Sequence, residues 1–178
     1  MRALVVYESM FGHTEQIARA VATGLSVHGD TDVREVEGLV GHVGAGYDLI
    51  VVGGPTHAFS MSRDSTRADA IERGATQGSQ LLGIREWLEH LGRHPQEAMV
   101  ATFDTRVQRV RRLPGSAAKA AAKRLRALGF EAAAAPESFY VLDVDGPLGD
   151  GELDRARAWG TTVARAALHH RTAAHTDR

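Results

Sequence analysis

Short apolar runs alternate with helical patterns along this chain of 178 residues, and this alternation constrains the fold more than any other feature. It is typical of βαβ units, which build a parallel sheet covered by helices. We predict strands at residues 2–7, 31–36, 48–52, 98–103 and 138–142. We predict helices at 13–28, 84–91, 116–128 and 151–168, with a helical turn or two at 67–73. The expected architecture is a three-layer, doubly wound α/β fold with a five-stranded parallel sheet.

Right-handed crossovers leave few arrangements for five strands, and the order 2-1-3-4-5 is a common one. In such sheets ligands bind outside the carboxyl ends of the strands, where the strand order reverses. The loops after strands one, three and four should therefore carry the ligand chemistry. No linker divides the chain, so we expect one domain at residues 1–170 and a polar tail at 171–178.

Composition narrows the classes of function. The chain has no cysteine, which excludes disulfides, thiolate nucleophiles and cysteine-ligated metals, and no metal-ligand pattern stands out. The formal net charge of -1 gives no reason to expect nucleic acid or a membrane surface as a partner. The amino terminus lacks a signal-peptide pattern, and no run reaches the roughly 20 apolar residues that span a bilayer. We expect a cytoplasmic protein, and a homodimer is one possible assembly.

The loop after the first strand has the chemistry of a phosphate site. It reads Ser9, Met10, Phe11, Gly12, His13, Thr14 and leads directly into a helix. A helix N-terminus supplies free N–H groups and a partial positive charge. Ser9 and Thr14 add hydroxyl donors, His13 adds a donor or a charge, and Gly12 lets the backbone approach the oxygens. The alternative is that these residues only form a turn and cap a helix.

The same segment resembles the flavodoxin signature. The specified positions are filled by Val5, Val6, Tyr7, Ser9, Gly12, Thr14, Ala18 and Val21. The resemblance implies a flavodoxin-like fold and FMN as cofactor, held through its phosphate by this loop. No Gly-Lys-Ser/Thr P-loop occurs, and the acidic cluster of a receiver domain is missing.

By this resemblance the loop after the third strand lies against the isoalloxazine ring. It contains Pro55, Thr56, His57 and Phe59 after two glycines. Thr56 and His57 could hydrogen-bond to the ring edge, and Phe59 could stack on it. His57 is also the candidate catalytic acid or base.

The loop after the fourth strand should hold the other side of the ring, with Thr102, Phe103, Asp104 and Arg106 as candidate contacts. An ordinary Asx turn at the end of a strand is the alternative reading. The sequence departs here from electron-carrier flavodoxins, which usually place a stacking Tyr in this loop.

Every charged residue from Arg106 to Arg126 is basic. Electron-carrier flavodoxins, which the chain resembles, are typically strongly acidic. A solvated helix face is the plain explanation. A cation at Arg106 or His57 near the ring would instead make the reduced flavin easier to form. The basic run could also bind an NADPH phosphate or an acidic partner protein.

Three functions remain open. The first is an FMN-dependent oxidoreductase that takes electrons from a reduced nicotinamide, NAD(P)H, or from a protein donor and passes them to a quinone-like acceptor. The second is a one-electron-carrier flavodoxin, and the third is a non-catalytic module with the same fold. The flavin would carry the chemistry in the first two cases, and the protein would orient it.

Overall fold

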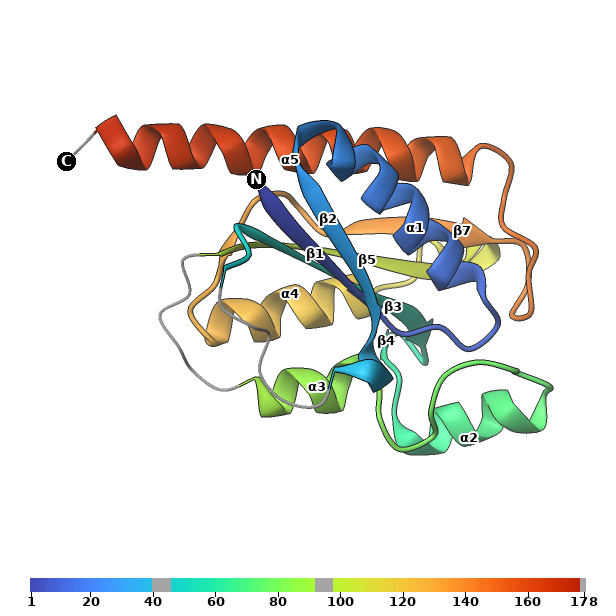
Figure 1. Ribbon diagram of the computed structural model, residues 1–178. Helices are drawn as coiled ribbons and strands as arrows, with labels where there is room; N and C mark the ends of the chain where they lie inside the picture. The colour runs from blue at the N-terminus through green and yellow to red at the C-terminus, as the bar shows by residue number, and fades with distance from the viewer. Residues whose placement is uncertain (40–45, 92–97, 177–178) are drawn as a thin grey trace.

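The computed structural model describes residues 1–39, 46–91 and 98–176, with side chains up to residue 170. A twisted sheet forms the middle layer and helices cover both faces (Figure 1). The strands are β1 (Arg2–Tyr7), β2 (Asp30–Glu35), β3 (Leu49–His57), β4 (Ser60–Met61), β5 (Met99–Val107), β6 (Glu131–Ala132) and β7 (Glu137–Val141). The helices are α1 (His13–Leu25), α2 (Asp64–Glu72), α3 (Ile84–His90), α4 (Ala117–Ala127) and α5 (Glu152–Thr176).

The sheet confirms the predicted parallel α/β fold. Its strand order is β2-β1-β3-β5-β6, with β7 also paired to β5 and the short β4 antiparallel to β3. In chain order this is the predicted 2-1-3-4-5 pattern with a divided fifth position. The sheet has seven strands in place of the predicted five.

The fifth position is divided because the chain between β6 and β7 leaves the ladder. Ala133 still donates its N–H to the carbonyl of Val100, at 2.8 Å. Pro136 then follows, and a proline has no N–H to donate to a neighbouring strand. The ladder resumes at Glu137, which pairs with Phe103.

Two strands extend well past their predicted ends. The third strand was expected to end at residue 52 and the fourth at 103, but β3 continues to His57 and β5 to Val107. Gly53 and Pro55 are poor strand formers, yet both keep their register against β5. Gly53 also fits because the Phe103 ring occupies the space that a Cβ would need. Residues predicted to be loop are therefore rigid sheet.

Two apolar clusters lie on opposite faces of the sheet. One packs α1 and α5 against the strands and contains Ile17, Phe139 and Val163. Phe103 joins it, with its ring 6.0 Å from that of Phe139 and 6.2 Å from that of Trp159. The other cluster packs α3 and α4 against the far face. These layers leave the carboxyl edge of the strands to the connecting segments.

Helix boundaries follow the predictions with local changes. The predicted helix at 13–28 is α1 followed by a 3₁₀ turn at Ser26–His28, and the turn predicted at 67–73 is α2. The last helix was expected to end at residue 168, but α5 continues to Thr176. Residues 177 and 178 of the predicted tail lie outside the described residues. No helix in the described part of the chain is long and apolar enough to cross a membrane.

Helices α1 and α5 touch through two glycines. A Cβ at Gly24 would collide with the carbonyl oxygen of Arg157, and a Cβ at Gly160 would collide with that of Val21. Both glycines are in helices, so helix propensity alone would favour alanine by about 1 kcal/mol. Their absence of a side chain lets the two backbones approach closely.

Replacing either glycine should therefore destabilise the protein. We expect Gly24→Ala and Gly160→Ala each to lower the free energy of unfolding by about 1–3 kcal/mol, the cost of overpacking. Urea denaturation followed by circular dichroism measures this. Gly38→Ala is the control, because a Cβ there meets no atom within 4 Å and should change stability by no more than about 0.5 kcal/mol. Equal stability of all three variants would contradict the close helix contact.

Candidate functional site

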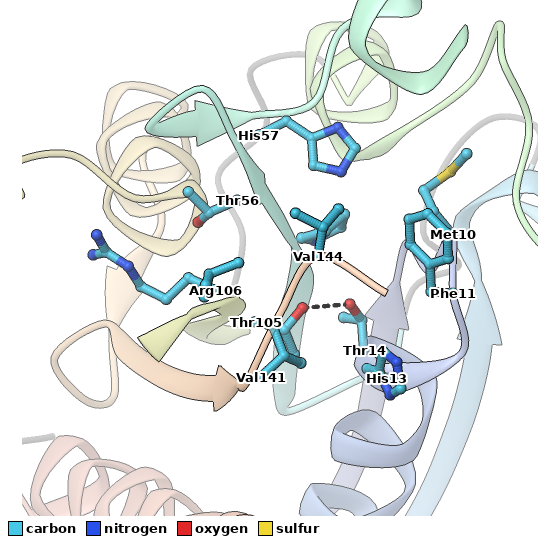
Figure 2. Close-up of a pocket in the computed structure, with 12 residues that line it drawn as sticks. Met10, Phe11, His13, Thr14, Thr56, His57, Thr105, Arg106, Val141 and Val144 are labelled. Carbon is cyan, nitrogen blue, oxygen red and sulfur yellow. Dashed lines mark hydrogen bonds between the residues drawn. The ribbon is translucent and has the colours of Figure 1, made fainter. Parts of the chain in front are cut away.

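An open groove, which encloses about 90 Å³, lies at the carboxyl edge of the sheet, where the sequence predicted a ligand. It lies between the loop after β1, the ends of β3 and β5, and the segment after β7 (Figure 2). The lining residues are Met10, Phe11, His13, Thr14, Pro55, Thr56, His57, Thr105, Arg106, Val107, Val141 and Val144.

The loop after β1 leaves part of the first turn of α1 open. Gly12 precedes the helix with φ +84°, a left-handed conformation that a residue with a Cβ rarely adopts. The buried Ser9 hydroxyl accepts the N–H of Gly12 at 3.1 Å and that of Glu15, the third residue of the helix, at 3.4 Å. Ser9 therefore shapes the loop, and the N–H groups of His13 and Thr14 remain for an anion.

Two side chains of the first turn of α1 connect this loop to neighbouring segments. The Thr14 hydroxyl lies 2.7 Å from that of Thr105 at the end of β5 (Figure 2). His13 Nε2 lies 2.9 Å from the carbonyl oxygen of Asp145, in the segment after β7. His13 Nδ1 is buried and has no hydrogen-bond partner within the described residues. Because Nε2 donates to the carbonyl of Asp145, Nδ1 of the neutral ring is an acceptor and has no hydrogen for an anion.

The end of β3 supplies the opposite wall. Pro55, Thr56 and His57, which the sequence indicated as flavin contacts, line the groove, whereas Phe59 does not. Phe59 is 49% exposed and sits in the turn after β3 with φ +66°. The aromatic ring that does line the groove is that of Phe11.

The surroundings of His57 disfavour its charged form. Burial and the positive charge of Arg67 lower the pKa of the imidazole below its ordinary value of 6.5. A neutral imidazole at the groove can donate one hydrogen bond and accept another.

Successive side chains of β5 point to opposite faces of the sheet. The residues that we expected to contact the flavin together after the fourth strand therefore lie on different faces. Thr102 donates to the carbonyl of Ala118 at 3.0 Å, so its hydroxyl is used on the α4 side of the sheet. Asp104 is fully buried on the same side and accepts the N–H of Ala118 at 3.0 Å. The structure does not bring these two side chains, or the core residue Phe103, to the groove.

Asp104 still supports the groove wall indirectly. Its Oδ2 accepts the hydroxyl of Thr56 at 3.0 Å, and that same hydroxyl oxygen accepts the N–H of Ala117 at 2.9 Å. The ends of β3 and β5 are thereby joined to the start of α4. Thr56 consequently has a fixed position beside the groove.

Arg106 lines the groove with its stem, but its guanidinium points away from it (Figure 2). Nη2 donates to the carbonyls of Val110 at 2.8 Å and Leu113 at 3.3 Å. With Arg106 engaged elsewhere and the charged form of His57 disfavoured, the structure does not provide the cation that we expected beside a flavin ring.

Four lining residues were missed in the sequence. Thr105 and Val107 belong to β5 residues beyond the predicted strand end. Val141 and Val144 come from β7 and the segment after it, a loop that the rule of strand-order reversal did not single out. Had the fourth strand been predicted to continue past residue 103, the alternation of side chains along it would have placed Thr105 at the groove.

A buried ionic network beside the groove was also missed. Glu8, which is 2% exposed, accepts the N–H of Ile84 at 2.9 Å, and burial raises the pKa of its carboxyl. Arg67 of α2 is fully buried, donates to the Ser62 hydroxyl at 2.8 Å and forms an ion pair of 3.1 Å with Glu86. These contacts fasten the segment that contains α2 and α3 to the end of β1.

Comparisons with known proteins identify the fold. No protein-family model matches the chain, and no curated protein matches it in sequence. Solved structures do match. The flavodoxin 2 of Bacillus cereus superposes with a TM-score of 0.64 at 19% identity, covering 93% of this chain and 99% of that one. A flavodoxin from the domain Archaea gives a TM-score of 0.61 at 19% identity, covering 95% and 100%.

An enzyme is also among the similar structures. A flavone reductase gives a TM-score of 0.57 at 16% identity, covering 94% of this chain and 63% of that one. At such low identities the similarity concerns the fold. The chain has a flavodoxin-like fold, and what it binds is a separate question.

The lowered pKa of His57 can be measured directly. In an NMR titration we expect its imidazole to titrate below pH 6.5, assigned by the signal that disappears in His57→Gln. The unfolded chain then binds more protons than the folded chain between the two pKa values. Stability should therefore fall as pH drops from 6.5 through this window, and less so in His57→Gln. A midpoint at or above pH 6.5 would refute the assignment of a neutral imidazole.

Proposed function

We propose that this protein binds FMN in the groove and acts as an oxidoreductase, moving electrons from a reduced nicotinamide or a protein donor to a quinone-like acceptor. One observation carries the proposal. The start of α1, where Gly12 has a positive φ and the N–H groups of His13 and Thr14 remain open, borders a groove at the carboxyl edge of a flavodoxin-like sheet. An anion at the helix start and a flat ring in the groove fit both features.

The residues of the groove suit the parts of FMN. The N–H groups of His13 and Thr14 at the start of α1 and the Thr14 hydroxyl would hold the phosphate. Phe11, Pro55 and Thr56 would hold the ring. Bound FMN would supply the redox chemistry. The protein's part is to fix the ring, to keep its edge open to a reactant, and to present a neutral imidazole at His57.

The position of His57 in the groove supports the enzyme over the carrier. Reduction of a quinone-like acceptor needs protons as well as electrons, and an imidazole beside the reactants can relay protons from water. We propose His57 as the group that moves this proton. Electron transfer between proteins requires no such group, so the carrier function gains nothing from it.

Phosphate recognition can be tested by comparing FMN with riboflavin. We expect the protein to bind FMN and to bind riboflavin at least tenfold more weakly. Thr14→Val should raise the Kd for FMN by a factor of about 10 to 150, since a hydrogen bond to a charged group contributes about 1.5–3 kcal/mol, and should leave riboflavin binding nearly unchanged. Quenching of flavin fluorescence measures both.

Thr23→Val is the matched control for Thr14→Val. Thr23 lies on the same helix, and its hydroxyl donates to the carbonyl of Arg19 at 3.0 Å, away from the groove. It should bind FMN like the unchanged protein. Equal affinity for FMN and riboflavin, or no flavin binding, would refute the proposal.

The enzyme is distinguished from the carrier by its donor. Anaerobic stopped-flow absorbance should show NADH or NADPH bleaching the flavin, and a quinone restoring it. His57→Gln should slow the step with the quinone and leave the Kd for FMN within about threefold. Bleaching by a protein donor alone, with no dependence on His57, would favour the carrier.

A further inference from the structure

A basic segment borders the groove and has no role in the function proposed above. Between Arg106 and Arg126 the chain carries arginines and lysines and no acidic residue, although the whole protein has a formal net charge of -1. The first part of this segment, residues 107–116, connects β5 to α4 and contains a 3₁₀ turn at Gln108–Val110. It begins at Val107, which lines the groove. Positive charge is therefore concentrated at one side of the groove mouth.

The backbone of this connection is fixed from inside. Arg106 is 6% exposed, and its guanidinium holds the carbonyls of Val110 and Leu113, as described above. A buried arginine that braces two carbonyls of one loop gives that loop a defined shape. Its other arginines are consequently presented from a rigid support.

Those other arginines face solvent. Arg109 forms an exposed ion pair with Asp143 at 3.1 Å, a type of pair that contributes little to stability. Arg111 and Arg112 are exposed, and no ion pair joins them to a carboxylate in the part of the chain that the structure describes. Adjacent like charges without partners repel each other, so an external negative surface would relieve a cost already present.

Exposed apolar side chains accompany the arginines. Leu113 is 47% exposed, and Phe59 is 49% exposed. The backbone of Phe59 lies against Gly115, where a Cβ would come within 2.5 Å of the Phe59 carbonyl oxygen. We call Phe59 together with residues 109–113 the basic face. Apolar side chains bordered by charge are the usual composition of a protein–protein interface.

We infer that the basic face is the docking surface for an acidic electron-carrier protein, which would bind beside the groove mouth and exchange electrons with the cofactor proposed above. This inference rests on the proposed function, because docking would serve electron exchange with the bound cofactor. The location of the docking surface rests on the charge and exposure of the residues of the basic face. The two large exposed apolar side chains favour a protein over a nucleotide phosphate, which would require converging donors in a pocket. Complementary charge would speed association and make it sensitive to salt.

Docking can be mapped on the full chain by NMR. The ¹⁵N-labelled protein, with FMN added, is titrated with an acidic plant-type [2Fe–2S] ferredoxin and, separately, with the basic protein cytochrome c. We expect amide shifts from the ferredoxin at Phe59 and residues 109–113, and binding at least tenfold weaker at 150 mM than at 10 mM ionic strength. Cytochrome c should not shift these amides.

Charge reversal separates this face from general attraction. The double variant Arg111→Glu with Arg112→Glu should weaken ferredoxin binding at least tenfold. The control is Lys123→Glu with Arg124→Glu, which makes the same change of charge at exposed positions in the last turns of α4, toward the other edge of the sheet. It should retain most of the affinity.

The inference would be wrong if ferredoxin shifted no amides, or shifted amides on another face of the protein. It would also be wrong if the two double variants weakened ferredoxin binding equally. Amide shifts at Arg111 and Arg112 with NADPH but not with ferredoxin would likewise contradict it. Flavin absorbance of the same samples keeps the two proposals separate. If the protein binds FMN but ferredoxin shifts no amides of the basic face, only the docking surface is refuted. Docking shifts in a protein that takes up no FMN would retain the surface and refute the proposed function.

Discussion

The parallel register of β1, β3 and β5 is the constraint on which the groove depends. Tyr7 pairs with Gly53, and Gly53 pairs with Phe103, so the three strands deliver their carboxyl ends to one edge. The polar links across that edge follow from this alignment. The hydroxyl of Thr14 contacts that of Thr105, and the hydroxyl of Thr56 donates to Asp104, because β1, β3 and β5 all end at this edge of the sheet. A slip of one residue would turn these side chains to the opposite faces.

Local sequence patterns correctly predicted the first strand and the start of the first helix, which position the loop after β1. The apolar run through Val5 and Val6, followed by the segment from Ser9 to Thr14, contains both a strand and a helix start within a few residues, and each is decided by nearby residues. The sheet order followed from the alternation of elements and from the rule for crossovers. These inferences require no knowledge of which distant residues meet.

The rest of the site depends on distant contacts. Gly53, Gly54 and Pro55 look like a loop, and only their pairing with Phe103 to Thr105 keeps them in the sheet. That pairing imposes alternation on β5, which sends Asp104 toward α4 and Thr105 toward α1. The ion pair of Arg67 and Glu86 also depends on a distant contact. Charged residues are normally exposed, so nothing in the sequence indicated that Arg67 is buried.

The glycine contact between α1 and α5 has a consequence for the order in which the site is completed. It joins the first helix of the chain to the last one, and the phosphate loop is attached to the first. The amino-terminal half of the groove therefore lacks its outer layer until α5 has been synthesised. A nascent chain would expose the side of α1 that packs on α5 until then, and ligand binding would have to wait for that helix.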